Sequence, residues 1–555
     1  MSVGALARAA RADLSPWGAV LGGLAVAASF SPSLLPRTWP LQGAAAGITG
    51  ALVYLVTVLV VRLVREVATL ADVSVGITVR APRAVRIGVA VLLGLALLAY
   101  GLWALAEQRT TARLVLMPPP PWWHPVLALG LAIVVAAACI AVARVLRRAS
   151  EAVARHLPRA VPRWAAVTAG ALVVATTTVA LTDAVLVSRV TQAIGERFYE
   201  INAQVREGVT APTTAGRSGG PDSGVAWGSL GQEGQVFVAG GPDAAQITRV
   251  TGAPAVDPVR VYAGLETSGS IDDAAHRVVD ELRRTGAFER SVLVVYFTTG
   301  TGWVNEWSAQ SVEYLTGGDS AIAAMQYSYL PSPLALISDR VSSPRAARAL
   351  FDRVQTEVQS LPADDRPQLM VAGESLGSFG GHGAFADAEE MLADVDGGVW
   401  VGTPAFTPLW RTITDERQQG SPEVAPVVDN GRHLRFATRA EDLEADLYGR
   451  PLGEWEEPRI AYLQHASDPI SRWDGDLLLS RPDWIRERAG TDVNPQVRWL
   501  PLVTFWQVTT DQAVGNSTQQ GHGHIYHDDV VTAWAAVLGA EGTDVGAVIE
   551  AIRSR

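Results

Sequence analysis

A serine inside a G-x-S-x-G motif is the residue of this chain best suited to covalent chemistry. The motif occurs twice, around Ser375 at residues 373–377 and around Ser218 at residues 216–220. Ser375 follows the apolar run 369–372 and precedes a stretch compatible with a helix, whereas Ser218 lies among Thr, Gly and Pro. A nucleophilic serine of this kind sits on a tight turn between a strand and a helix. We therefore predict that Ser375 is a nucleophile and that Ser218 is not.

A serine hydroxyl needs an imidazole to accept its proton and a carboxylate to orient that imidazole. Asp468 is the best-placed acid, because it directly follows the apolar run 459–465 and precedes a proline. Asp474 and Asp476 are the reserve candidates.

The base is expected among three histidines that crowd into residues 521–527, just before a predicted final helix at 528–538. A Gly-His-x-Tyr turn into that helix favours His524 as the base. His522 is the first alternative and His527 the second.

An oxyanion formed during acyl transfer needs two backbone N–H groups directed at it. The residue after the nucleophile, Leu376, is expected to supply one. The loop 298–303 is expected to supply the other through Thr299, Gly300 or Thr301, because its glycines let backbone approach a substrate. The alternative for this loop is an ordinary turn at the end of a strand.

The spacing H-x-H-x-x-H-D at residues 522–528 also suggests a divalent metal site. Only 28 residues follow His527, and the single cysteine, Cys139, is far away in the sequence. We therefore expect no metal and no cofactor. The chain contains no lysine, which excludes mechanisms that need a lysine amine.

Short β-branched runs alternate with helical patterns after residue 235, which predicts an α/β domain with a doubly wound, mostly parallel sheet of eight strands. The predicted strands are 235–239, 259–263, 292–297, 321–329, 368–372, 398–402, 459–465 and 497–506. Helices are predicted at 271–285, 305–315 and 344–361. A stretch rich in Gly, Pro, Ser and Thr at 208–234 predicts a linker, so we expect domains at 1–186 and 235–555 joined by 187–234.

The first third of the chain is expected to be an all-α transmembrane domain of about five spans. Five uncharged apolar stretches are long enough to cross a bilayer, and tryptophans lie near their ends. These stretches are residues 17–35, 39–61, 87–106, 125–143 and 164–182. The alternative for the first stretch is a cleaved signal peptide.

Arginine counts predict the orientation of these spans. Thirteen Arg lie in the set of connections that includes the N-terminus and three in the opposite set, and Arg-rich connections stay in the cytoplasm. We therefore expect a multi-pass protein of the cell membrane whose second domain is extracytoplasmic. That expectation depends on the number of spans being odd.

Charge is distributed unevenly between the two parts. Residues 1–186 hold 16 Arg against 6 acidic residues, and the rest of the chain holds 29 Arg against 50 acidic residues. A nucleic-acid-binding domain would cluster basic side chains, so the acidic second part predicts that nucleic acid is not a partner. We expect the bilayer itself and a lipid or cell-envelope ester to be the partners, and oligomeric state is not predicted.

Several long motifs together resemble a bacterial family of membrane-embedded hydrolases, alpha/beta-hydrolase family 9, which has its own multi-span N-terminal domain. They are residues 30–37, 299–303, 326–332, 373–380, 463–469 and 521–524. The resemblance covers nearly the whole chain and implies a serine hydrolase of the carboxylic-ester type.

Two classes of function follow from these observations. The first is a membrane-anchored serine hydrolase of the esterase or lipase type, acting on a lipid or cell-envelope ester through a Ser-His-Asp triad. Acyl transfer to another hydroxyl is its variant. The second is a non-catalytic membrane scaffold with a hydrolase-like binding domain, since a fold alone does not guarantee activity.

Overall fold

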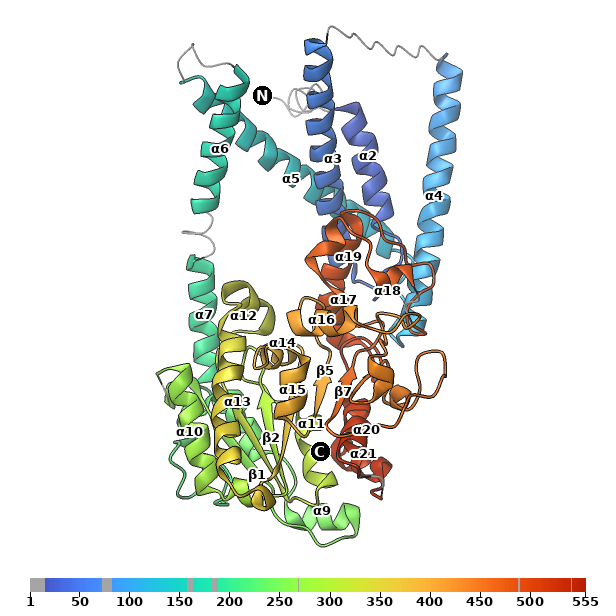
Figure 1. The fold of residues 1–555 in the computed structure, drawn as a ribbon. Coiled ribbons are helices and arrows are strands. Elements are labelled where there is room, and N and C mark those ends of the chain that lie inside the picture. Colours follow the sequence, from blue (N-terminus) through green and yellow to red (C-terminus); the bar gives the residue numbers. More distant parts are fainter. Residues whose placement is uncertain are drawn as a thin grey trace. The chain divides into compact units, whose positions relative to one another are not determined.

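A seven-stranded, fully parallel sheet organises the second part of the chain (Figure 1). The computed structural model describes residues 15–71, 82–156, 163–181, 188–267, 269–487, 490–540 and 542–555. Within these residues the strand order is β1-β3-β2-β4-β5-β7-β6. The strands are β1 (Val259–Ala263), β2 (Val292–Phe297), β3 (Ser320–Met325), β4 (Gln368–Glu374), β5 (Gly397–Val401), β6 (Leu434–Ala437) and β7 (Arg459–Leu463).

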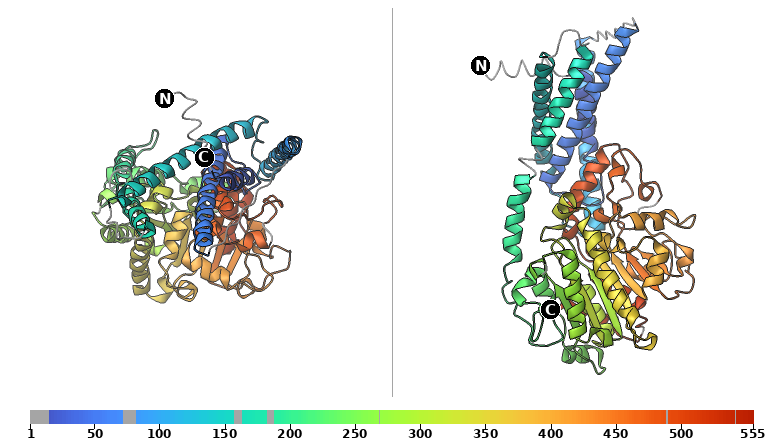
Figure 2. Two further views of the ribbon diagram at one scale, coloured as in Figure 1. Left: turned by 90° about the horizontal axis from the view of Figure 1, so that it is seen from above. Right: turned by 60° about the vertical axis from the view of Figure 1, so that its left-hand side comes forward.

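Helices cover both faces of this sheet (Figures 1 and 2). One face buries a core under α10 and α13, and the other face buries a core under α8, α11 and α20. The strands are buried along almost their whole length, as a parallel sheet between two helical layers requires. The helices of this unit are α7 (Ser188–Asn202), α8 (Gly231–Ala239), α9 (Ala244–Thr251), α10 (Ile271–Arg284), α11 (Glu306–Leu315), α12 (Ser332–Ser338), α13 (Ser342–Ser360), α14 (Leu376–His382), α15 (Ala388–Asp394), α16 (Pro408–Asp415), α17 (Pro469–Arg472), α20 (His527–Val537) and α21 (Val545–Arg553).

The prediction of eight strands is wrong, and the errors have physical causes. Residues 235–239 belong to helix α8, because a five-residue apolar run fits a buried helix as well as a strand. Residues 497–506 contain Pro501 and a turn with φ of +64° at Leu502, and helix α19 (Val503–Asp511) begins directly after it. Strand β6 was missed because Arg435 interrupts its four residues. The buried Arg435 guanidinium is satisfied by the carbonyls of Gly431 and Leu443 at 3.0 and 2.8 Å.

Helices also form at the five apolar stretches of the first part of the chain. They are α2 (Pro16–Ala28), α3 (Trp39–Leu70), α4 (Arg83–Leu114), α5 (His124–Ala154) and α6 (Arg163–Leu181). Among the described residues, α3, α4 and α5 are long and apolar enough to cross a membrane, and α2 and part of α6 are shorter apolar helices. Helix α2 ends earlier than predicted because the segment Ser31-Pro32-Ser33 leaves the helix.

The chain forms two compact units, and neither is a single continuous stretch of the sequence. One gathers residues 1–186 with two later segments, Gly475–Arg486 and Thr491–Thr518, and the other holds the sheet. In the first unit, α19 packs on α3. Helix α18 (Asp483–Arg486) lies in the first of these two segments.

A buried ion pair links the two ends of the sequence inside the first unit. Arg37 Nη1 lies 3.2 Å from Asp511 Oδ1, and both side chains are almost completely buried. The other carboxylate oxygen accepts bonds from Ser33 Oγ at 2.5 Å and from the Leu34 backbone N–H at 3.1 Å. These contacts fix the loop after α2 to α19, because a buried carboxylate is stable only with such donors.

Candidate active site

Ser375 occupies a strained turn between β4 and α14. Its φ and ψ are +54° and −120°, a conformation that L-residues rarely adopt. The turn is tight on both sides, since a Cβ on Gly373 would lie 2.8 Å from the carbonyl carbon of Gly377. A Cβ on Gly377 would lie 2.2 Å from the Phe297 carbonyl oxygen at the end of β2. The sequence places glycine where the backbone leaves no room, and the serine side chain remains half-buried.

Ser218, the serine of the second motif, has a different environment. It is fully buried, and its hydroxyl donates to Glu281 Oε2 at 2.9 Å and accepts from the Tyr262 backbone N–H at 3.1 Å. The hydroxyl is therefore engaged in holding the segment before β1.

Asp468 and His524 form a buried pair. His524 Nδ1 lies 2.7 Å from Asp468 Oδ2, and the same oxygen accepts a bond from the Tyr526 hydroxyl at 2.7 Å. Asp468 also caps α17 by accepting the Ile470 backbone N–H at 2.8 Å. Asp468 follows β7, and His524 lies in the loop before α20.

The contact lowers the pKa of Asp468 and raises the pKa of His524. Burial alone would raise the pKa of Asp468, but the interactions with His524, Tyr526 and Ile470 outweigh it and lower that pKa. Burial alone would lower the pKa of His524, but the Asp468 carboxylate outweighs it and raises that pKa. An imidazole held in this way keeps its second nitrogen, Nε2, as the proton acceptor.

The end of β5 lies between the serine and this pair. The Ser375 backbone N–H donates to the Val401 carbonyl at 2.9 Å. The next residue, Gly402, has φ of +54°, and a Cβ there would lie 2.4 Å from His524 Cε1 and 3.2 Å from Asp468 Oδ2. The three predicted residues therefore gather at the carboxyl edge of the sheet. Within the described part of the chain no hydrogen bond joins Ser375 Oγ to His524, and such bonds are often long without substrate.

The other candidate histidines and acids have different surroundings. The backbone of His522 forms an isolated antiparallel β-bridge with Ile525. The His527 ring stacks on Trp307 with ring centroids 4.8 Å apart. Asp474 pairs with Arg411 at 3.3 Å. Asp476 lies in the other compact unit. In the residues that the structure describes, no three His, Cys, Asp or Glu side chains converge as metal ligands would.

The loop after β2 narrows the choice of oxyanion donors. The Thr299 N–H donates to the Trp303 carbonyl at 3.3 Å, so this N–H is already used inside the turn. The backbone N–H groups of Gly300 and Thr301 remain the candidate oxyanion donors of this loop. Gln326 Nε2 holds the Thr301 carbonyl at 2.9 Å, which fixes this part of the loop.

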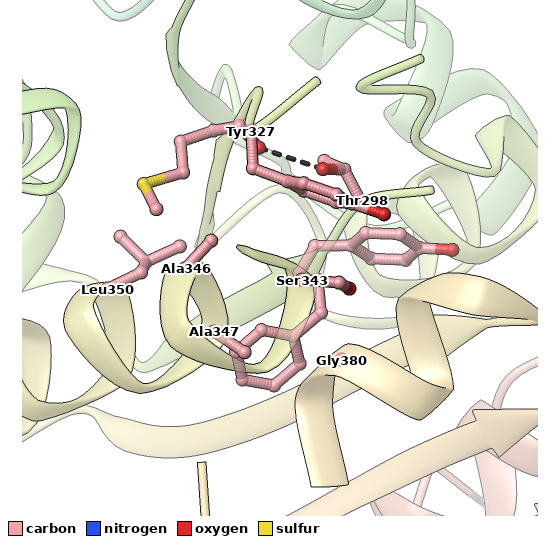
Figure 3. Close-up of a pocket in the computed structure, with 10 residues that line it drawn as sticks. Thr298, Tyr327, Ser343, Ala346, Ala347, Leu350 and Gly380 are labelled. Atoms are coloured by element: carbon pink, nitrogen blue, oxygen red, sulfur yellow. Dashed lines mark hydrogen bonds between the residues drawn. The ribbon is translucent and has the colours of Figure 1, made fainter. Parts of the chain in front are cut away.

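A small cavity lies behind this loop (Figure 3). Thr298 Oγ1 donates to the Met325 carbonyl at 2.8 Å, and Tyr327, Ser343 and Gly380 line the same space. Its volume is about 10 Å³, which is the size of one water molecule. The cavity lies among the loop after β2, α13 and α14, and it is too small to hold a substrate.

Two supporting groups were not assigned from the sequence. His465 stacks on Tyr526 with ring centroids 4.0 Å apart and bonds the Gly523 carbonyl at 2.9 Å and Asp529 Oδ2 at 3.2 Å. These contacts fix the loop that carries His524. Tyr526, the tyrosine of the Gly-His-x-Tyr pattern, was the one sequence feature that pointed to this support of the His524 loop.

Glu374 is the second group. It precedes the serine, is only 6% exposed, and accepts a hydrogen bond from Asn305 Nδ2. Burial raises the pKa of Glu374, and its charge interacts with His524. Glu374 is therefore a buried carboxyl group whose charge can influence His524.

The comparison with known families follows the same division of the chain. Residues 259–548 match the Alpha/beta-hydrolase family, and residues 30–242 match the Alpha/beta-hydrolase family N-terminus. The chain belongs to the alpha/beta-hydrolase family. This confirms the resemblance to family 9 that the motifs indicated, and it supports a hydrolase-type function. Neither a curated protein nor a solved structure matches this alpha/beta-hydrolase.

Proposed function

We propose that this protein is a serine hydrolase that cleaves carboxylic esters, with Ser375 as nucleophile, His524 as base and Asp468 as the orienting acid. The observation that carries the proposal is the buried 2.7 Å bond between His524 and Asp468, next to the strained turn of Ser375. A scaffold without catalysis would have no need for a positive φ at a serine, which costs of the order of 1–3 kcal/mol.

The proposed reaction has two steps. His524 Nε2 accepts the proton of Ser375 Oγ as this oxygen bonds the acyl carbon, and the same proton passes to the leaving alcohol when the ester bond breaks. Water then gives a proton to His524 and its oxygen to the acyl carbon. The bond between the acyl carbon and Ser375 Oγ breaks, the acid leaves, and His524 returns the proton to Ser375 Oγ. The N–H of Leu376 and one N–H of residues 300–301 would bind the oxyanion in both steps.

The proposed substrates are lipid or cell-envelope esters. Among the residues that the structure describes, three helices long and apolar enough to cross a membrane precede the sheet, which supports a membrane protein and an ester that is found at a membrane. The excess of Arg in alternate connections supports an extracytoplasmic hydrolase unit. Protease accessibility of that unit in intact cells and in inverted vesicles tests this orientation.

Hydrolysis of p-nitrophenyl esters by the purified full-length protein tests the proposed activity. We expect wild type and Ser218→Ala to retain turnover and Ser375→Ala to lose at least about 10³-fold in kcat, because the nucleophile is absent. Loss of turnover in Ser218→Ala with retention in Ser375→Ala would refute the assignment. Product analysis with added glycerol separates hydrolysis from acyl transfer.

A further inference from the structure

Helices α3 and α5 pack closely near their N-terminal ends and separate further along. A Cβ on Gly43 would lie 2.8 Å from the Ala128 carbonyl oxygen, and a Cβ on Gly47 would lie 2.7 Å from the Ala132 carbonyl oxygen. The contacts advance in the same direction along both helices, so the two helices run parallel. Figure 1 shows them diverging toward their C-terminal ends.

The divergence leaves a cavity of about 260 Å³ between the two helices. Tyr54 and Val58 of α3 and Ile140 of α5 are among its apolar lining residues. Arg62 of α3 and Arg144 and Arg147 of α5 line it as well. The cavity is therefore apolar toward the middle of the helices and strongly basic toward their C-terminal ends.

Arg144 is the lining arginine whose contacts point most directly to a ligand. Arg147 Nε lies 3.7 Å from Glu151, a loose contact with a half-exposed carboxylate. Arg144 Nη2 is buried and has no hydrogen-bond partner among the described residues. A buried guanidinium N–H without an acceptor is costly, so this geometry suits an anionic acceptor from outside the chain.

We propose that this cavity binds the headgroup of an anionic phospholipid. The phosphate would accept hydrogen bonds from Arg62, Arg144 and Arg147, and an acyl chain would lie along the apolar wall toward Tyr54. A basic pocket between apolar helices close to their charged ends is the arrangement that recognises such lipids. The helices place it at the depth where phosphates lie, because Arg62 directly follows the uncharged stretch 39–61.

Native mass spectrometry of the full-length protein in detergent, titrated with phosphatidylglycerol or phosphatidylcholine, tests the site. We expect a bound phosphatidylglycerol that phosphatidylcholine does not replace at equal concentration. The double variant Arg62→Gln/Arg144→Gln should weaken this binding by about tenfold or more, because two charge-assisted hydrogen bonds are lost. Ala143 also lines the cavity, and Ala143→Phe should weaken binding because the larger side chain fills the space without changing charge.

The matched control is Arg65→Gln/Arg148→Gln. These exposed arginines lie on the same two helices and are not among the lining residues, so the control makes the same change in charge. We expect less than a twofold effect. Equal losses in both double variants, or equal binding of the two lipids, would overturn the proposal. Displacement by millimolar inorganic phosphate or glycerol phosphate would assign the site to a free phosphate and would overturn the lipid assignment.

Discussion

His524 and Asp468 are 56 residues apart in the sequence and 2.7 Å apart in the fold, and both side chains are buried. The bond joins a loop after β7 to the loop before α20. Three further donors, from Tyr526, Ile470 and Ser471, hold the carboxylate in place. The orientation of the imidazole is therefore determined by the protein before any substrate binds.

Replacing Asp468 with Asn should lower kcat by about 10³–10⁴-fold, because the amide can present an N–H to His524 and favour the wrong tautomer. Steady-state ester hydrolysis measures this effect. Asp474→Asn is the control, since Asp474 pairs with Arg411 instead, and its kcat should change by less than about threefold. A kcat of Asp468→Asn within tenfold of wild type would contradict the role of this acid.

The pH dependence of kcat/KM should have an acidic limb with its midpoint above 6.5. The base must be neutral to accept the serine proton, and the pKa of His524 is raised from its ordinary value by Asp468 and Glu374. Activity is therefore lost as pH falls through this raised pKa.

Glu374→Gln should shift that acidic limb to lower pH, because it removes a negative charge that stabilises protonated His524. The pH profile distinguishes this effect from a general loss of structure, which would lower the rate without moving the midpoint. Glu389→Gln, at an exposed position in α15, should leave the midpoint unchanged. An unshifted limb in Glu374→Gln would show that this residue carries no charge when His524 titrates.

Gly402→Ala should reduce kcat/KM by about 10²-fold, because the new Cβ would lie 2.4 Å from His524 Cε1 and displace the imidazole. Gly420→Ala is a close control, since Gly420 also has a positive φ but nothing lies within 4 Å of its Cβ position. Both variants place alanine at a positive φ, but only the Gly402→Ala side chain would meet His524. Only Gly402→Ala should therefore lose activity. Equal activities in the two variants would argue against the placement of His524.

Arg37→Met should destabilise the first unit by about 3–5 kcal/mol, because it leaves the buried Asp511 carboxylate without its cation. Thermal unfolding in detergent measures this change. Arg197→Met removes an exposed ion pair with Glu200 and should cost less than about 1 kcal/mol. A Tm of Arg37→Met equal to that of Arg197→Met would show that the buried pair contributes little.

Much of the sheet was predictable because buried parallel strands form continuous apolar runs. Residues 259–263 and 292–297 are strands with the predicted bounds, and four other predicted runs overlap strands. The apolar pattern does not mark the strand at β6, where Arg435 interrupts it, and it does not distinguish a strand from a helix in the short run 235–239, which folds as α8. No local pattern shows that residues 491–518 group with the first unit, because the Arg37–Asp511 pair is a contact across 474 residues.

The site could be predicted in part for similar reasons. Local motifs and strand ends mark Ser375, Asp468 and His524 as candidates, and the structure places His524 beside Asp468. The choice among Thr299, Gly300 and Thr301 depends on which N–H is already bonded, and only the folded loop shows this. The burial of Glu374 depends on Asn305, which lies 69 residues away in the sequence.

Labelling of membranes that contain the full-length protein with a fluorophosphonate, followed by mass spectrometry of the modified peptide, tests the central claim most directly. We predict a single adduct on Ser375 that is lost in Ser375→Ala and His524→Ala and retained in His522→Ala and Ser218→Ala. No adduct on folded wild-type protein, or an adduct on Ser218, would contradict the assignment of this site as a serine hydrolase centre.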